Sequence, residues 1–131
     1  MTATPTDLYR IRIAGWGIES SSISESLSPN LKIRRAGEVI NPRTDKRESE
    51  NHIWIEASTT YEEGFEQPLD ELLNTLKLSE SLTGLFAECA YVELQIFVSL
   101  DDENHVPSIH LSPDQVRFLS QLGAHVDIDI I

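Results

Sequence analysis

Residues 90–100 read Ala90-Tyr91-Val92-Glu93-Leu94-Gln95-Ile96-Phe97-Val98-Ser99-Leu100, and this stretch decides the fold class. Aliphatic residues occupy every second position, while polar and aromatic residues occupy the others. Side chains of a strand point alternately to its two faces, so this period of two predicts a strand with one apolar face and one mixed face. Such a strand is typical of a largely antiparallel sheet that helices cover on one side.

Downstream, the acidic turn Asp101–His105 leads into a second alternating run, Val106–Leu111, which predicts a hairpin. Ser112–Gln115 combines an N-cap, a proline at the first helical position and a glutamine at N3, and Gly123 marks the end of this helix. His125–Ile131 is then predicted as the last strand. We expect its inward residues to be Val126, Ile128 and Ile130.

Upstream, Pro68 introduces leucines at helical spacing, followed by a shorter helical turn before Cys89. His52–Ser58 alternates like a strand. Predicted core residues are the following: Leu72, Leu76, Leu94, Ile96, Val116, Leu119 and Ile128.

The N-terminal third is predicted as strand 8–14, a Gly15-Trp16-Gly17 turn, a short helix within 18–28 and strand 31–35. Residues 41–51 are charged and aperiodic, which predicts a mobile loop, and residues 1–6 are expected to be a flexible tail. The order is β-α-β-β-α-β-β-α-β. We therefore expect one α+β domain over residues 1–131, with a mainly antiparallel or mixed sheet of five to six strands and helices packed on one face.

Charge is unevenly distributed along the 131 residues, whose net charge is −12. Residues 1–47 hold eight Lys/Arg against five acids, a balance of +3, whereas residues 48–131 hold two against seventeen, a balance of −15. Such a chain should be repelled by bulk nucleic acid and by anionic membranes. A single cysteine, no apolar run of membrane-spanning length and no signal-peptide pattern predict a soluble, cytoplasmic protein.

Several of these segments together resemble a known family. They are Leu27-Ser28-Pro29 after the first strand, the Trp-bearing strand Ile53-Trp54-Ile55, the helix start Pro68-Leu69-Asp70-Glu71, and the ending from Leu111-Ser112-Pro113 to Ile130. The chain resembles the bacterial family called domain of unknown function 4279 over nearly its whole length. Residues 41–51 and Gly15-Trp16-Gly17 depart from the family pattern. The resemblance implies a small cytoplasmic bacterial protein and carries over no catalytic residue.

No motif in the sequence indicates catalysis or a cofactor. There is no phosphate-binding glycine loop and no nucleophile elbow, and Cys89 is interpreted as a small buried residue. We expect no cofactor and no metal. An alternative metal or small-ligand site would use His110, His125, Asp127 and Asp129. However, alternate residues of a strand lie about 6.5 to 7 Å apart, which does not favour convergence on one ion.

The mixed face of the sheet is the remaining candidate surface. Tryptophan, tyrosine and arginine are enriched at binding hot spots, although cross-strand packing alone also explains such residues. Candidate partner-binding residues are Arg10, Arg12, Trp54, Glu56, Tyr91, Glu93, Asp101, Asp102 and Glu103. The leading hypothesis is a non-enzymatic protein-binding module, such as an immunity-type inhibitor of a basic partner protein. The alternatives are a small-ligand or metal-dependent enzyme with its site near the last strand, and a self-associating protein.

Overall fold

A computed structural model describes residues 8–19, 22–23, 31–60, 62–99 and 108–130. The predicted tail at residues 1–6, most of the predicted helix within 18–28, and the acidic turn Asp101–His105 lie outside these residues. None of the helices in this part of the chain is long and apolar enough to cross a membrane.

The described residues form a main sheet of five strands in the order β2-β5-β1-β6-β7. Their bounds are β1 Leu8–Trp16, β2 Lys32–Arg34, β5 His52–Thr60, β6 Tyr91–Val98 and β7 Ala124–Ile130. All neighbouring pairs are antiparallel except β6 and β7, which are parallel. Parallel neighbours need a long crossover connection, and residues 99–123, which include helix α3, provide it. The predicted α+β class and mixed sheet are confirmed.

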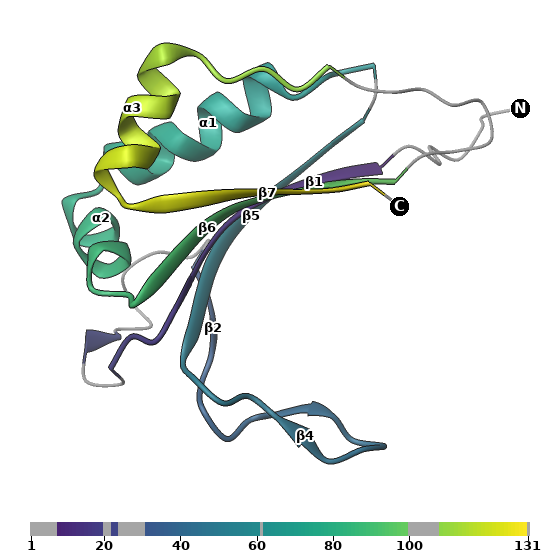
Figure 1. Ribbon diagram of the computed structural model, residues 1–131, viewed down its shortest axis with the longest axis vertical. Helices are drawn as coiled ribbons and strands as arrows, with labels where there is room; N and C mark the ends of the chain where they lie inside the picture. The colour runs from purple at the N-terminus through teal and green to yellow at the C-terminus, as the bar shows by residue number, and fades with distance from the viewer. Residues whose placement is uncertain (1–7, 20–21, 24–30, 61, 100–107, 131) are drawn as a thin grey trace, which may run out of the picture.

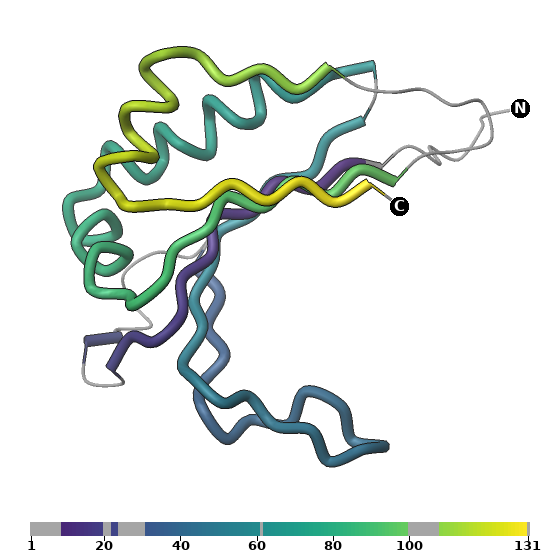
Figure 2. The backbone as a smooth tube through the Cα atoms, viewed as in Figure 1, coloured from purple at the N-terminus to yellow at the C-terminus, as the bar shows by residue number. Residues whose placement is uncertain are grey.

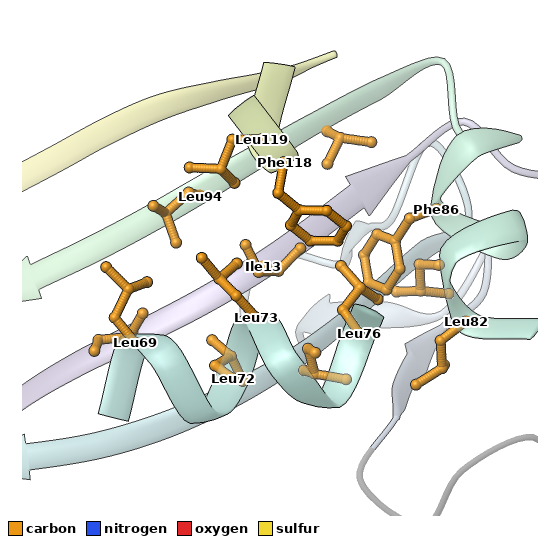
Figure 3. Close-up of a cluster of buried hydrophobic side chains, with 14 of the residues drawn as sticks. Ile13, Leu69, Leu72, Leu73, Leu76, Leu82, Phe86, Leu94, Phe118 and Leu119 are labelled. Carbon is orange, nitrogen blue, oxygen red and sulfur yellow. The ribbon is translucent and has the colours of Figure 1, made fainter. Parts of the chain in front are cut away.

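In the part of the chain that the structure describes, three helices lie on one face of this sheet (Figure 1): α1 Glu66–Lys77, α2 Glu80–Ala87 and α3 Pro113–Gln121. Each presents its apolar stripe to the strands. Figure 3 shows leucines of α1, with Leu82 and Phe86 of α2 and Phe118 and Leu119 of α3, around Ile13 and Leu94. The predicted start of α3 is confirmed, because Ser112 and Gln115 form a reciprocal capping box with Pro113 in the first turn.

Two predictions about the chain between elements are wrong. Residues 41–51 are predicted as a mobile loop without strands, but β3 Val39–Asn41 and β4 Lys46–Arg47 form a small hairpin that projects from the end of the sheet away from the helices (Figure 2). Asp45 adopts a φ of 54°, which turns the chain there. The predicted strand Val106–Leu111 is also wrong for its described part, because residues 108–111 belong to no strand.

The core prediction holds for five of the seven residues. Leu72, Leu76, Leu94, Ile96 and Leu119 are at most 6% exposed. Val116 and Ile128 were predicted as core, but they are 50% and 45% exposed. Val126 and Ile130, also expected inward, are 45% and 56% exposed. Val126, Ile128 and Ile130 do face the helix side, but β7 lies at the edge of the sheet and the helices leave its apolar side largely uncovered. Val116 of α3 borders the same uncovered hollow as Val126.

Candidate functional site: the outer sheet face

The candidate surface is the sheet face opposite the helices, which we call the outer face. In β1, Ile11 and Ile13 are fully buried against the helices, so Arg10 and Arg12 point the other way. The register aligns Arg12 with Glu56 of β5 and with Gln95 of β6. By the same alternation Trp54, Tyr91 and Glu93 share the outer face. Six of the nine predicted partner-binding residues therefore lie together, and Asp101, Asp102 and Glu103 fall outside the described residues.

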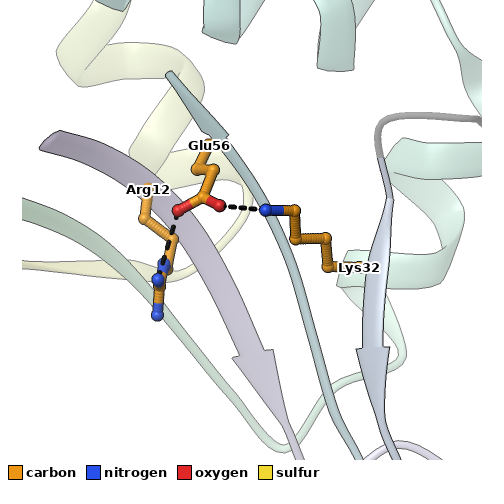
Figure 4. A network of polar contacts seen from close by, with 3 residues as sticks. All are labelled: Arg12, Lys32 and Glu56. Carbon is orange, nitrogen blue, oxygen red and sulfur yellow. Dashed lines mark hydrogen bonds and ion pairs between the residues drawn. The ribbon is translucent and has the colours of Figure 1, made fainter. Parts of the chain in front are cut away.

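A three-residue ion-pair network lies on the β2–β5–β1 side of this face. Glu56 accepts hydrogen bonds from Lys32 and, at 3.2 Å, from Arg12 (Figure 4). These bonds, first from Lys32 and then from Arg12, hold the pKa of Glu56 below its ordinary value. Because Arg10 and Arg34 lie on the same side, this half of the outer face carries an excess of positive charge.

A continuous series of rings crosses four strands of the outer face. Trp54 contacts His52 at 4.7 Å between ring centroids, His52 stacks on Trp16 at 4.4 Å, Trp16 meets Tyr91 at 5.7 Å, and Tyr91 stacks on His125 at 4.6 Å. We call these five residues the aromatic row. Such cross-strand ring pairs stabilise a sheet that no helix covers.

Arginines cover one end of the aromatic row. The guanidinium carbons of Arg12 and Arg34 lie 5.1 and 5.7 Å from the centre of the Trp54 ring. Burial, reinforced by these two cations, lowers the pKa of His52 to about 4. His52 is 6% exposed, and neither of its ring nitrogens has a hydrogen-bond partner among the described residues. It is therefore a neutral, stacked ring at physiological pH.

Two glycines place Trp16 in the aromatic row. A Cβ on Gly15 would lie 2.5 Å from Cys89 Sγ, and a Cβ on Gly17 would lie 2.8 Å from the Cβ of Ala90. Gly17 has a φ of 77°, a conformation that glycine adopts at no steric cost. The segment between α2 and β6 thus packs directly on this backbone. Burial raises the pKa of Cys89 to about 11, so its thiol stays protonated at neutral pH.

The β6–β7 side of the outer face is acidic. Glu93 lies between Tyr91, whose hydroxyl donates to it at 2.6 Å, and Gln95, which donates at 3.0 Å. Asp127 and Asp129 follow on β7, aligned with Gln95 and Phe97. The charge of Asp129 is the main cause of a raised pKa at Asp127, and Glu93 adds to it. The outer face is therefore divided into a basic half and an acidic half, and the aromatic row crosses both.

The alternative metal residues are not brought together. His125, Asp127 and Asp129 lie on the outer face, whereas His110 lines a hollow with Glu66 and neighbouring residues at the start of α1, on the helix side. Among the described residues, no group of three or more His, Cys, Asp or Glu side chains is arranged to hold a metal ion. A larger hollow of about 540 Å³ between the helices is lined by Lys77, Phe118 and polar side chains, including the Arg117–Asp114 ion pair.

Sequence reasoning missed Trp16, His52 and His125 as members of one cluster. Trp16 was assigned to a turn, but β1 continues through it, and its register with His52 and Tyr91 depends on strand neighbours far away in sequence. His52 did carry a local signal, because it lies two residues before Trp54 and so shares its face.

Comparison with known proteins identifies one family. The family model described as "Domain of unknown function (DUF4279)" matches residues 11–131. No curated protein and no solved structure matches the chain.

Proposed function

The chain belongs to the DUF4279 family, whose function is unknown, and we propose that it is a non-enzymatic binding module that takes a basic protein partner on its outer face. The observation that carries the proposal is the aromatic row ending at Tyr91 and His125 in the acidic half. Tyr91 is 40% exposed, unlike the inner members of the row. Tyrosine and tryptophan beside charged groups are the typical composition of a binding hot spot.

The acidic half supports a basic partner. Asp127 and Asp129 are exposed, and their mutual repulsion raises the pKa of Asp127, so a cation placed beside them would relieve unfavourable electrostatics. The excess of acidic over basic residues within residues 48–131 adds to the negative potential that such a partner would meet. Complementary charge accelerates encounter and discriminates between partners, while buried aromatic anchors slow dissociation. An immunity-type inhibitor, which occludes a basic protein, is the biological role that we propose for this arrangement.

The experiment is affinity capture from the native organism with the wild-type chain and with Tyr91→Ala, followed by kinetic measurements on the captured protein. Tyr91→Ala should speed dissociation at least about tenfold, because a central aromatic anchor contributes about 2 kcal/mol or more. The double change Asp127→Lys/Asp129→Lys should mainly slow association and reduce its dependence on salt. Reversing Asp101, Asp102 and Glu103 is expected to act in the same way.

The control is the double change Glu38→Gln/Glu50→Gln, which removes two exposed charges flanking the β3–β4 hairpin, away from β7. It should leave both rate constants nearly unchanged. Tyr91→Ala could capture the same proteins with the same dissociation rates as wild type. In that case the aromatic row only stabilises the sheet, and the proposed function is wrong.

A further inference from the structure

Strand β7 is an open edge. Among the described residues it pairs with β6 alone, so one side of its backbone faces no other described strand. Six of its seven residues are exposed, and Ala124 is half-buried. Edge strands are commonly protected from indiscriminate pairing by a bulge, a proline or charged side chains, above all lysine. β7 has no proline, no lysine and no bulge, because its register with β6 runs through seven pairs without a shift, and its only full charges are Asp127 and Asp129.

The helix side of β7 is apolar and accessible. Val126, Ile128 and Ile130 are 45–56% exposed, and Val116 of α3 beside them is 50% exposed. A hollow of about 290 Å³ lies between α3 and β7, lined by residues that include Leu111, Val116 and Val126. Exposed aliphatic side chains in a continuous stripe are typical of an interaction surface.

The outer side of β7 carries the charge that selects an occupant. Asp127 and Asp129 alternate with the aliphatic residues, and neither forms an ion pair among the described contacts. A strand laid along this edge would place its own side chains alternately beside the aliphatic stripe and beside the two carboxylates. The complementary segment therefore alternates aliphatic residues with Lys or Arg.

We propose that β7 accepts an extended segment of a partner protein, with alternating aliphatic and basic residues, as a sixth strand of the main sheet. Backbone hydrogen bonds to the open edge would supply affinity, and the two alternating faces would supply specificity. The inference rests on the proposed function only for the basic character of the partner, and it adds the mode of recognition.

A second copy of the chain is the competing occupant. Symmetric antiparallel pairing of two β7 strands about Asp127 would set Asp127 opposite itself, and pairing about Ile128 would set Asp127 opposite Asp129. Like charges directly opposite each other on a sheet are destabilising, and each copy carries a net charge of −12. In these two registers the charge pattern, together with the net charge of each copy, favours a basic segment over self-association.

The test uses synthetic peptides that alternate lysine and valine, titrated against the full chain by fluorescence anisotropy. The alternating peptide should bind at least about tenfold more tightly than a peptide of the same composition with its lysines and valines in separate blocks, since only alternation matches both faces. N-methylation gives a sharper test. In a strand, the amides of alternate residues point in opposite directions, so methylating the valine amides and methylating the lysine amides should have unequal effects, one abolishing binding and the other retaining it.

Surface variants locate the peptide. Asp127→Asn/Asp129→Asn and Ile128→Ser should each weaken peptide binding by about tenfold, and the first should also flatten its salt dependence. Glu38→Gln/Glu50→Gln serves as the charge-matched control and should bind like wild type. The inference is overturned if both N-methylated peptides bind equally well, if the Asp variant behaves like the control, or if sedimentation shows a dimer that Ile128→Ser dissociates.

Failure of this inference differs from failure of the proposed function. Partner binding could depend on Tyr91 but not on Ile128, while the two N-methylated peptides behave alike. This result would support the outer face as the binding surface and refute the addition of a sixth strand at β7.

Discussion

The close packing of Gly15 against the segment after α2 leads to a quantitative prediction. A Cβ at Gly15 would lie 2.5 Å from Cys89 Sγ, 3.2 Å from Cys89 Cβ and 3.3 Å from Phe86 Cδ1. Phe86 is fully buried, so it has little room to move away. The φ of Gly15 is not positive, which means that alanine is compatible with the backbone and only the packing opposes it.

The expected cost of Gly15→Ala follows from these contacts. Overpacking a tight site costs about 1–3 kcal/mol, while the reduced entropy of the unfolded chain returns about 0.4–1 kcal/mol. The free energy of unfolding should therefore fall by about 1–2 kcal/mol. Cys89→Ala alone should cost about 1 kcal/mol, because it removes one partly buried atom. In the double variant the 2.5 Å clash disappears. The double variant should therefore lose about 1 kcal/mol less stability than the sum of the losses of the two single variants.

Urea unfolding of the four proteins in this double-mutant cycle measures the coupling, with unchanged m values as the check that the unfolded state is comparable. Gly84→Ala is the matched control, because nothing lies within 4 Å of its Cβ position in α2. It should stabilise the protein by about 1 kcal/mol. Additivity of Gly15→Ala and Cys89→Ala within about 0.5 kcal/mol would refute the claim that the sulfur limits the space at Gly15.

Two further predictions concern the core and pH. Leu94→Ala should lower the free energy of unfolding by about 2–5 kcal/mol, because Leu94 is fully buried. Val116→Ala should cost well under half as much, because Val116 is 50% exposed. Similar losses for the two variants in urea titrations would contradict this assignment of buried and exposed residues. The His52 pKa of about 4 lies below the unfolded value of 6.5, so the unfolded state takes up a proton first as pH falls. As the pH falls from about 6.5 to 4, the free energy of unfolding of the wild type should therefore drop by up to about 3 kcal/mol because of His52. His52→Gln should lack this contribution and keep only the pH dependence of the other titrating groups. Equal pH slopes for wild type and His52→Gln would show that His52 is not held neutral.

Much of the architecture was predictable because it depends on local patterns. The alternation in β6 marks its two faces without reference to any neighbour, and the leucine spacing in α1 marks the stripe that meets the sheet. The cap at Ser112 needs only four consecutive residues. The outer placement of Trp54, Glu56, Tyr91 and Glu93 followed from the same period of two.

What a strand pairs with is decided by residues distant in sequence, and here local patterns failed. β7 alternates like an inner strand, yet it lies at the edge, so Val126 and Ile128 remain accessible. The aromatic row exists only because Trp16 is in register with both His52 and Tyr91.

The sequence by itself determined the class of fold, the faces of its strands and the acidic excess of its C-terminal two-thirds. Only the tertiary structure decided that β7 is an open edge and that the outer face has a basic half and an acidic half. The physical reason is that side-chain alternation is set by the geometry of one strand, whereas strand order and register depend on the packing of the whole chain.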